Sequence, residues 1–269
     1  MRERIITGLI LALVLIPLLF VSVAIFNIVL GIFALYGAYE IIRVFEHKHR
    51  YRISFMVYHI IATGLIYTVV LVDYHSVLTI NSVLISLLAL VVLSLVWYVF
   101  DADLDTDNLA KSWLAILYVG FGFASISLIR AIGLELLGYL LILTMATDIF
   151  AYFSGYLFGK RKLAPLISPK KTVEGAIGGT IIAVILATLY RYLMPSFDDM
   201  SLLLIVFIGV IVSFLAQIGD LVASKIKRAH EVKDFSNLLP GHGGILDRFD
   251  SSIFAAMTLM IVVMILEVF

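Results

Sequence analysis

The sequence predicts an all-α fold, a polytopic integral membrane bundle of about nine transmembrane helices. Of the 269 residues, 62% are hydrophobic and only 14% are charged, whereas a soluble domain carries roughly a quarter charged residues. The mean hydropathy is +1.11. Apolar runs of about twenty residues recur along nearly the whole chain, which is the length that crosses a hydrocarbon core of roughly 30 Å.

The expected spans follow these runs in order. The first run comes after Arg2 and Arg4, is too long for a cleaved signal peptide, and is followed at once by a second run, so we expect an uncleaved first helix. Pro17, Ser22 and Asn27 are the only breaks between the first two spans. We place the spans, with ends defined to within several residues, at 5–23, 25–45, 55–72, 77–100, 113–129, 133–150, 176–193, 202–223 and 251–268.

Positive charge alternates between the expected connections. Two arginines precede the first span, and Lys and Arg then gather at 43–52, 160–171 and 225–248, whereas the first, third, fifth and seventh connections nearly lack them. The positive-inside rule therefore predicts a cytoplasmic N-terminus. The fourth connection is mainly acidic although it should be cytoplasmic, but carboxylates contribute little to orientation.

Charge and composition also exclude several classes of function. The formal net charge is zero and the chain has no cysteine, so there is no basic field for nucleic acid and no thiolate or disulfide chemistry. No repeat and no low-complexity linker divides the chain. We therefore expect one membrane domain, 1–269, in which 1–130 is a helix bundle without an assigned function and 131–269 is the catalytic half.

A first polar cluster runs from Asp148 to the start of the seventh span. Lys170 and Lys171 stand where a turn enters a helix, and a helix N-terminus beside two cations attracts phosphate. The alternative is an ordinary positive-inside loop followed by helix packing, because Gly175 and Gly179 form a small-xxx-small pair.

A second polar cluster lies near the end of the eighth span. The spacing of Gln217, Asp220, Ser224 and Lys227 places them on one helix face. An ionised aspartate one turn inside a span costs about 2.5–3.5 kcal/mol unless a cation or a water-filled cavity accepts it. The alternative to a functional site is a buried salt bridge from Asp220 to Lys225 or Lys227.

The third cluster begins with a glycine-rich turn. Gly241, Gly243 and Gly244 allow positive φ and expose backbone amides to an anion. His242, within this turn, either transfers a proton or only hydrogen-bonds the turn. Further along, Asp247 and Asp250 recur at the start of the ninth helix, three residues apart.

Oxygen ligands from two helix ends indicate a metal site. Asp220 at one helix end and Asp247 and Asp250 at another can jointly hold one or two divalent cations. Such hard oxygen ligands suit Mg²⁺, which usually keeps waters and shares its shell with substrate phosphates. Together with the lysines and the glycine-rich turn, they predict a site for metal-bound phosphates.

These residues resemble the signature of the phosphatidate cytidylyltransferases, also called CDP-diacylglycerol synthases. The stretch 148–175 is similar to a second region of that family, so the likeness covers roughly the C-terminal half. The signature itself, residues 224–250, runs through Ser224, Lys227, Arg228, Lys233, Asp234, Ser236, Pro240, His242, Gly243, Gly244, Asp247, Arg248 and Asp250.

The resemblance implies transfer of a cytidylyl group from CTP to phosphatidic acid, with Mg²⁺, giving CDP-diacylglycerol and pyrophosphate for phospholipid synthesis. It implies metal ligands Asp220, Asp247 and Asp250, and further catalytic residues Lys227 and Arg228. The implied substrate- and phosphate-binding residues are Lys170, Lys171, Ser224, Lys233, Gly241, His242, Gly243, Gly244 and Arg248.

Two other readings stay open. A CTP-dependent lipid kinase of the phytol or dolichol kinase type would pass on the γ-phosphate instead, and a cation-coupled transporter also uses intramembrane aspartates. We expect a bacterial inner-membrane protein with its site on the cytoplasmic side, membrane lipid as a partner and no nucleic acid. Pairs of small residues and polar helix faces permit a homodimer without requiring one.

Overall fold

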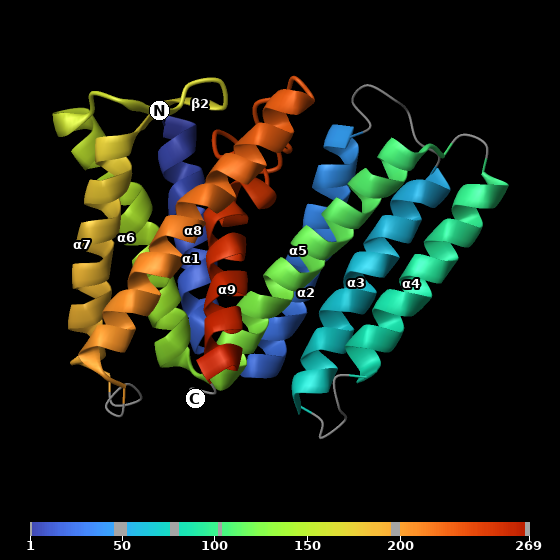
Figure 1. Cartoon of the computed structure of the whole chain (residues 1–269), viewed down its shortest axis with the longest axis horizontal. Coiled ribbons are helices and arrows are strands. Elements are labelled where there is room, and N and C mark those ends of the chain that lie inside the picture. The colour runs from blue at the N-terminus through green and yellow to red at the C-terminus, as the bar shows by residue number, and fades with distance from the viewer. Residues whose placement is uncertain (1, 46–52, 76–80, 102–103, 195–199, 267–269) are drawn as a thin grey trace. The chain divides into compact units, whose positions relative to one another are not determined.

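The computed structural model describes residues 2–45, 53–75, 81–101, 104–194 and 200–266, and they are almost entirely helical (Figure 1). In chain order the elements are α1 (Arg2–Phe20), α2 (Val23–Phe45), α3 (Ile53–His75), α4 (Asn81–Phe100), α5 (Thr106–Ile132), α6 (Leu134–Phe158), β1 (Lys162–Ala164), β2 (Ser168–Thr172), α7 (Val173–Arg191), α8 (Leu202–Ala229) and α9 (Leu246–Leu266).

Helix length and polarity confirm the predicted membrane bundle. Within the described ranges, eight helices are long and apolar enough to cross a membrane, and α1 is apolar over Ile6–Phe20. The chain is therefore an integral membrane protein. Of the basic residues behind the predicted orientation, Lys48, Arg50 and Arg52 lie outside the described residues, and the cytoplasmic N-terminus stays a prediction.

Several helix ends differ from the predicted ones. α8 continues to Ala229 instead of ending near residue 223, and α9 begins at Leu246 instead of 251. Hydropathy marks only the apolar part of a helix, whereas the polar ends continue the same backbone hydrogen bonds. As a result Asp220 lies well inside α8, and Asp247 and Asp250 lie near the start of α9.

The helices gather into two compact units. Residues 1–128 and 234–248 form the first, and residues 129–233 and 249–269 form the second. The segment 234–248 belongs to the same unit as the N-terminal helices, and the single membrane domain with its halves 1–130 and 131–269 stays a prediction. In the first unit α3 packs against α2 and α4; in the second, α6, α7 and α8 lie side by side (Figure 1).

Glycines let α6 and α7 approach closely. A Cβ added at Gly179 would lie 2.7 Å from the Thr147 carbonyl oxygen and 2.8 Å from the Ala151 Cβ, and one at Gly175 would lie 2.6 Å from the Ala151 carbonyl oxygen. Small residues at such spacing allow membrane helices to gain backbone-to-backbone van der Waals contact. The predicted small-xxx-small packing is therefore present.

We expect Gly179→Ala to destabilise the second unit by about 1–3 kcal/mol, because the added methyl group overpacks the α6–α7 contact. The measurement is the thermal unfolding midpoint of purified protein in detergent. Gly133→Ala is the matched control, since Gly133 has an extended φ of 178° and a Cβ there would meet nothing closer than 4.0 Å. Equal midpoints for both variants would contradict the packing argument.

Polar side chains also connect α6, α7 and α8. Thr147 Oγ1 lies 2.7 Å from Ser213 Oγ, which in turn donates to Thr180 Oγ1 at 3.1 Å. Gln217 Nε2 donates to the same Thr180 oxygen at 2.9 Å. Such bonds between membrane helices contribute about 0.6 kcal/mol each. They fix the rotation of α8 and so determine where Asp220, one turn further on, is presented.

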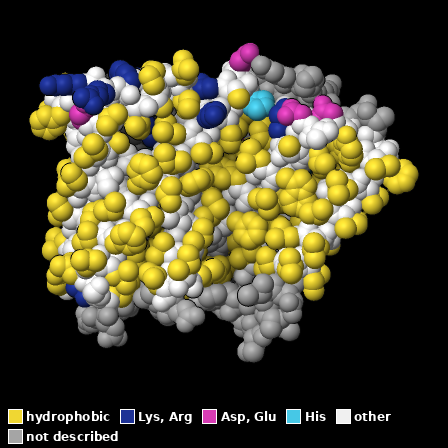
Figure 2. Space-filling model, viewed as in Figure 1, with side chains coloured by type: hydrophobic (Ala, Val, Ile, Leu, Met, Phe, Trp, Pro, Cys, Tyr) yellow, Lys and Arg dark blue, Asp and Glu magenta, His cyan; other side chains and the backbone are white. Residues whose placement is uncertain are grey.

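The surface agrees with a membrane location. Figure 2 shows hydrophobic side chains covering the flanks of the helices, while Lys and Arg gather where the β1–β2 hairpin lies. The hairpin tip carries Leu166, whose exposed fraction is 93%. Basic side chains at the helix ends and apolar side chains along the helices are the distribution expected of a protein that crosses a membrane.

Candidate active site

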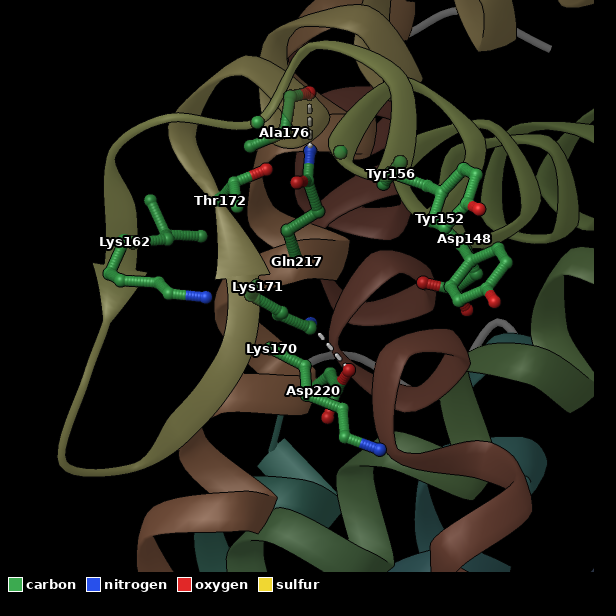
Figure 3. A pocket seen from close by; sticks show the side chains of 14 residues that line it. Asp148, Tyr152, Tyr156, Lys162, Lys170, Lys171, Thr172, Ala176, Gln217 and Asp220 are labelled. Carbon is green, nitrogen blue, oxygen red and sulfur yellow. Dashed lines mark hydrogen bonds and ion pairs between the residues drawn. The ribbon is translucent and has the colours of Figure 1, made fainter.

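A cavity of about 520 Å³ opens in the second unit between α6, α7, α8 and the β1–β2 hairpin (Figure 3). Cavities of roughly 300–1,000 Å³ are typical of sites for small ligands. Its polar lining combines cations, carboxylates and aromatic hydroxyl groups. The polar and aromatic residues that line it are Asp148, Tyr152, Tyr156, Lys162, Lys170, Lys171, Thr172, Gln217 and Asp220.

Local hydrogen bonds shape the hairpin that forms one wall of this cavity. The carboxylate of Glu174 accepts the backbone N–H groups of Lys160 at 2.9 Å and Arg161 at 3.1 Å. Thr172 caps α7, because its Oγ1 accepts from Gly175 N at 3.1 Å. These contacts bind both ends of the hairpin to the start of α7, which keeps the lysines of β2 at the cavity.

Asp220 pairs with a cation from the hairpin. Lys171 Nζ lies 2.5 Å from Asp220 Oδ2, and both side chains are about a quarter exposed, at 26%. Ser224 Oγ donates to the other carboxylate oxygen of Asp220 at 3.2 Å. From the sequence, Lys225 or Lys227 was the alternative salt-bridge partner of Asp220, but the partner is Lys171. The negative charge of Asp220 is therefore neutralised by this lysine, and both residues line the cavity.

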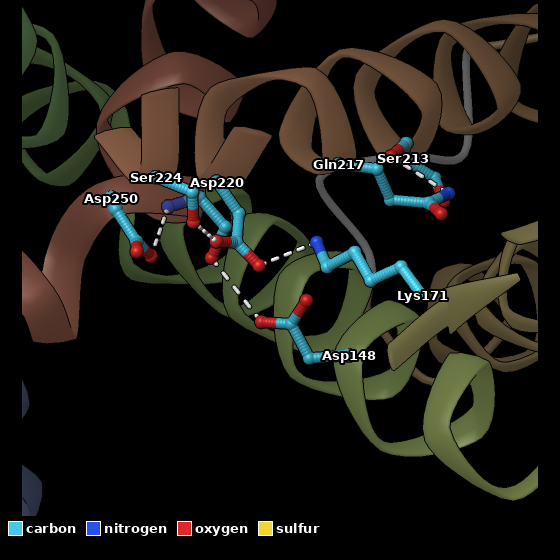
Figure 4. Close-up of polar contacts among 8 residues, drawn as sticks. Asp148, Lys171, Ser213, Gln217, Asp220, Ser224 and Asp250 are labelled. Atoms are coloured by element: carbon cyan, nitrogen blue, oxygen red, sulfur yellow. Dashed lines mark hydrogen bonds and ion pairs between the residues drawn. The ribbon is translucent and has the colours of Figure 1, made fainter. Parts of the chain in front are cut away.

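Two further aspartates lie close to Asp220 (Figure 4). Asp148 on α6 accepts a hydrogen bond from Ser251 Oγ at 3.2 Å. Asp250 on α9 interacts electrostatically with Asp220, Lys227 and Asp148. The helices meet here, because a Cβ added at Gly219 on α8 would lie 3.0 Å from the Asp250 carbonyl oxygen.

The donor set fits a metal ion that is shared with a substrate. Among the described residues, no three carboxylate or imidazole side chains converge closely enough to hold a metal by themselves. Mg²⁺ is usually bound by one or two carboxylates together with substrate phosphates and waters. Asp220 with one neighbouring aspartate supplies such a partial shell, so the residues fit Mg²⁺ bound jointly with phosphates.

The predicted residues from Gly241 to Arg248 belong to the first unit, in a segment that we call the signature loop, residues 234–248. Its turn is tight: Leu239 N donates to the Gly243 carbonyl at 2.8 Å, and His242 N donates to the Leu239 carbonyl at 2.8 Å. Gly241 and Gly243 have positive φ values of 76° and 79°, as predicted from their lack of a Cβ. The amide of His242 is therefore already used within the chain.

Asp247 organises this loop from within. Its Oδ2 accepts from Phe235 N at 2.7 Å and from Gly244 N at 2.9 Å, and only 7% of the residue is exposed. The Gly244 amide is thus used inside the loop as well. Asp247 belongs to the first unit, whereas Asp220 and Asp250 belong to the second. Its role as a metal ligand stays a prediction.

The predicted cations occupy different surroundings. Lys227 is buried, at 7% exposed, and interacts with Asp250, while Lys170 is exposed at the cavity. Arg228 is exposed and donates to the Val232 carbonyl at 3.0 Å. Lys233 and Arg248 are exposed as well.

Two carboxylates were not among the predicted site residues. Asp148 lines the cavity, and Glu40, on α2, is completely buried against the signature loop. Both are ionisable residues inside apolar spans, and that placement alone marks a candidate functional residue. The signal was therefore present in the sequence.

Comparison with known proteins identifies the family of the chain. A model of the cytidylyltransferase family matches residues 2–266. A phosphatidate cytidylyltransferase of Bacillus subtilis is 34% identical over 260 residues, which cover 94% of each chain. Two proteins of the same name, from Staphylococcus saprophyticus and Staphylococcus haemolyticus, are 45% and 43% identical over 141 residues, which cover 52% of this chain and 54% of each relative.

Proposed function

The chain belongs to the cytidylyltransferase family, and on this premise we propose that it transfers a cytidylyl group from CTP to phosphatidic acid. The products are CDP-diacylglycerol and pyrophosphate. The relatives that match it are named for this activity. Neither a lipid kinase nor a transporter is favoured by any of these relatives.

One observation in the structure carries the proposal: a cavity in which lysines face aspartates. Lys171 and Asp220 form an ion pair, in which Nζ lies 2.5 Å from Oδ2. A metal-bound triphosphate offers a better partner to each of them, since the lysine gains phosphate oxygens and the aspartate gains a cation. We infer that both side chains exchange partners when such a substrate binds.

The reaction needs no nucleophile from the protein. A phosphate oxygen of phosphatidic acid attacks the α-phosphorus of CTP and forms a new P–O bond. The bond from that phosphorus to the bridging oxygen of the β-phosphate breaks, and pyrophosphate leaves with the electron pair. Catalysis then consists of aligning two anions and compensating the charge that develops on the transferring group.

Each group of residues has a task in this scheme. Mg²⁺, when bound by Asp220 and its acidic neighbours, supplies charge neutralisation for the triphosphate. Lys170 and Lys171 hold phosphate oxygens at the cavity, and we assign the same role to Arg228, Lys233 and Arg248 from the signature. Tyr152 and Tyr156 offer aromatic faces on which the pyrimidine ring can stack.

The distribution of Lys and Arg along the chain supports a position for the site on one side of the membrane. The basic connections flank the hairpin and the signature, so we place the site on the cytoplasmic side of a bacterial inner membrane, with the N-terminus on the same side. The diacyl chains of the substrate and product stay in the bilayer and enter laterally between helices. A homodimer is compatible with this scheme and is not required by it.

The test is product analysis with pure protein, labelled CTP and phosphatidic acid, with and without Mg²⁺. We expect CDP-diacylglycerol and pyrophosphate to form in equal amounts, only when the metal is present. Formation of CDP would establish a lipid kinase instead. Ion flux through proteoliposomes without turnover of CTP would establish a transporter.

Asp247→Asn is expected to abolish CMP transfer without lowering the yield of folded protein. The amide oxygen of asparagine can still accept an N–H from the signature loop, whereas the negative charge for a metal is lost. Asp105→Asn is the matched control, because Asp105 Oδ1 likewise accepts a backbone N–H, from Asn108 at 2.6 Å, far along the sequence from the signature. Near-normal activity of Asp247→Asn with Mg²⁺ would refute the metal assignment.

A further inference from the structure

Glu40 on α2 makes three hydrogen bonds to the signature loop. Its Oε1 accepts from Ser236 Oγ at 2.5 Å and from Ile245 N at 3.0 Å, and its Oε2 accepts from Leu246 N at 2.8 Å. The residue is 0% exposed. A buried carboxylate is costly without such partners, so its position and that of the loop depend on each other.

Two of these donors stand at the beginning of α9. The first N–H groups of a helix have no partner within the helix, and they carry the positive end of its dipole. Ile245 and Leu246 belong to this group, because α9 begins at Leu246. Glu40 therefore caps α9 from a helix that is about 200 residues earlier in the chain.

The backbone of the loop is shaped for this contact. A Cβ at Gly244 would overlap Glu40 Oε1 and would lie 2.7 Å from Ser236 Oγ. One turn earlier on α2, a Cβ at Gly37 would lie 3.1 Å from a methyl group of Leu246. Glycines on both sides thus remove the atoms that would keep the loop away from α2.

We propose that Glu40 is a positioning residue that clamps the signature loop to α2 and thereby sets the Gly241–Gly244 turn and Arg248 for cytidylyl transfer. The inference rests on the proposed function for its effect on turnover, while the clamp itself is independent of it. Asp247 closes the loop from within, and Glu40 fixes the closed loop to the membrane bundle. The N-terminal half, which had no predicted task, then contributes directly to the site.

The test is Glu40→Gln, studied in the full-length protein by two measurements. The glutamine oxygen can replace only one carboxylate oxygen, and its NH₂ group opposes the N–H of Leu246. We expect hydrogen exchange in a peptide covering 235–246 to become faster. We also expect kcat and kcat/KM for CTP to fall together by about 100-fold, as they do when reacting groups are misplaced by about 1 Å.

Two further variants separate positioning from folding. Tyr39→Phe is the matched control on the same helix: it removes a hydroxyl whose bond, from Arg43 Nη1 at 3.2 Å, does not involve the loop, and it should leave both measurements unchanged. Ser236→Ala removes only one of the three donors and should cause a smaller change of both. It serves as the deciding variant if Glu40→Gln does not yield folded protein.

The outcomes are distinct. Unchanged exchange at 235–246 in Glu40→Gln, or unchanged exchange in Ser236→Ala where that variant has to decide, overturns the clamp. Faster exchange with kcat within about threefold of wild type overturns the positioning role, because 100-fold was expected. If wild-type protein does not transfer CMP at all, the proposed function fails, and the exchange data still decide whether Glu40 holds the loop.

Discussion

Asp220→Asn is expected to lower CMP transfer by on the order of 1,000-fold while the protein remains folded. Metal-assisted charge stabilisation amounts to several kcal/mol, and each 1.36 kcal/mol corresponds to about a factor of ten in rate. Asparagine keeps the size of the side chain and can still accept from Ser224 Oγ, which lies 3.2 Å from the aspartate. The measurement is the initial rate with saturating CTP and phosphatidic acid across a Mg²⁺ series.

The chain offers a close control for this variant. Asp107 on α5 also forms an ion pair with a lysine, Lys111, at the same distance of 2.5 Å, but its side chain is 73% exposed. Asp107→Asn should change the rate by less than a factor of two, as expected for an exposed pair that contributes below about 1 kcal/mol. Equal rates for the two variants would rule out a metal at Asp220.

Lys171→Gln is expected to lower kcat/KM for CTP by about 100-fold, because a charge-assisted contact to phosphate is lost. The Mg²⁺ concentration for half-maximal activity should also fall. In the wild type Lys171 forms an ion pair with Asp220 at 2.5 Å, so the lysine competes with the metal for the same carboxylate. The two parameters therefore move in directions that a general loss of structure does not produce.

Lys111→Gln, which removes the lysine of the exposed pair, is the control for this second variant and should leave both parameters unchanged. Lys171→Gln with an increased Mg²⁺ requirement would refute the exchange of partners between the ion pair and a metal-bound triphosphate. An unchanged kcat/KM for CTP would refute the contact to phosphate.

The membrane bundle was predictable because hydropathy alone reports burial in lipid. The predicted spans coincide with α2, α3, α4 and α6 to within several residues at most ends. The polar ends were not predictable in this way. The hairpin 162–172 was not predicted, and only a turn at the lysines before α7 was expected. Three residues in β1 and five in β2 are too few to show a pattern of alternating polarity.

Part of the candidate site was also readable from the sequence. Helical spacing placed Asp220 and Ser224 on one face, and they are hydrogen-bonded. The cation that pairs with Asp220 was not predictable, since neighbours on the same helix are favoured by spacing, whereas Lys171 comes from the hairpin. That contact depends on how α7 packs against α6 and α8, which no local pattern encodes.

Glu40 shows a different limit of sequence reasoning. A single carboxylate in an apolar run signals a function, but it does not say which partner it has. Its partners, Ile245 and Leu246, use backbone N–H groups, and every residue except proline carries one. Only the folded structure shows which backbone N–H groups lie next to the Glu40 carboxylate on α2.

The large sequence separation between Glu40 and its hydrogen-bond donors also has a consequence for biosynthesis. The acceptor leaves the ribosome 205 and 206 residues before its two amide donors, which at about 5–20 residues per second is a delay of roughly 10–40 s. During this interval the carboxylate of Glu40 lies in an apolar segment that has already been translated, without the amide donors of Ile245 and Leu246. The contact between Glu40 and the start of α9 therefore forms only after α9 has been synthesised, and a nascent chain stalled before that point lacks it.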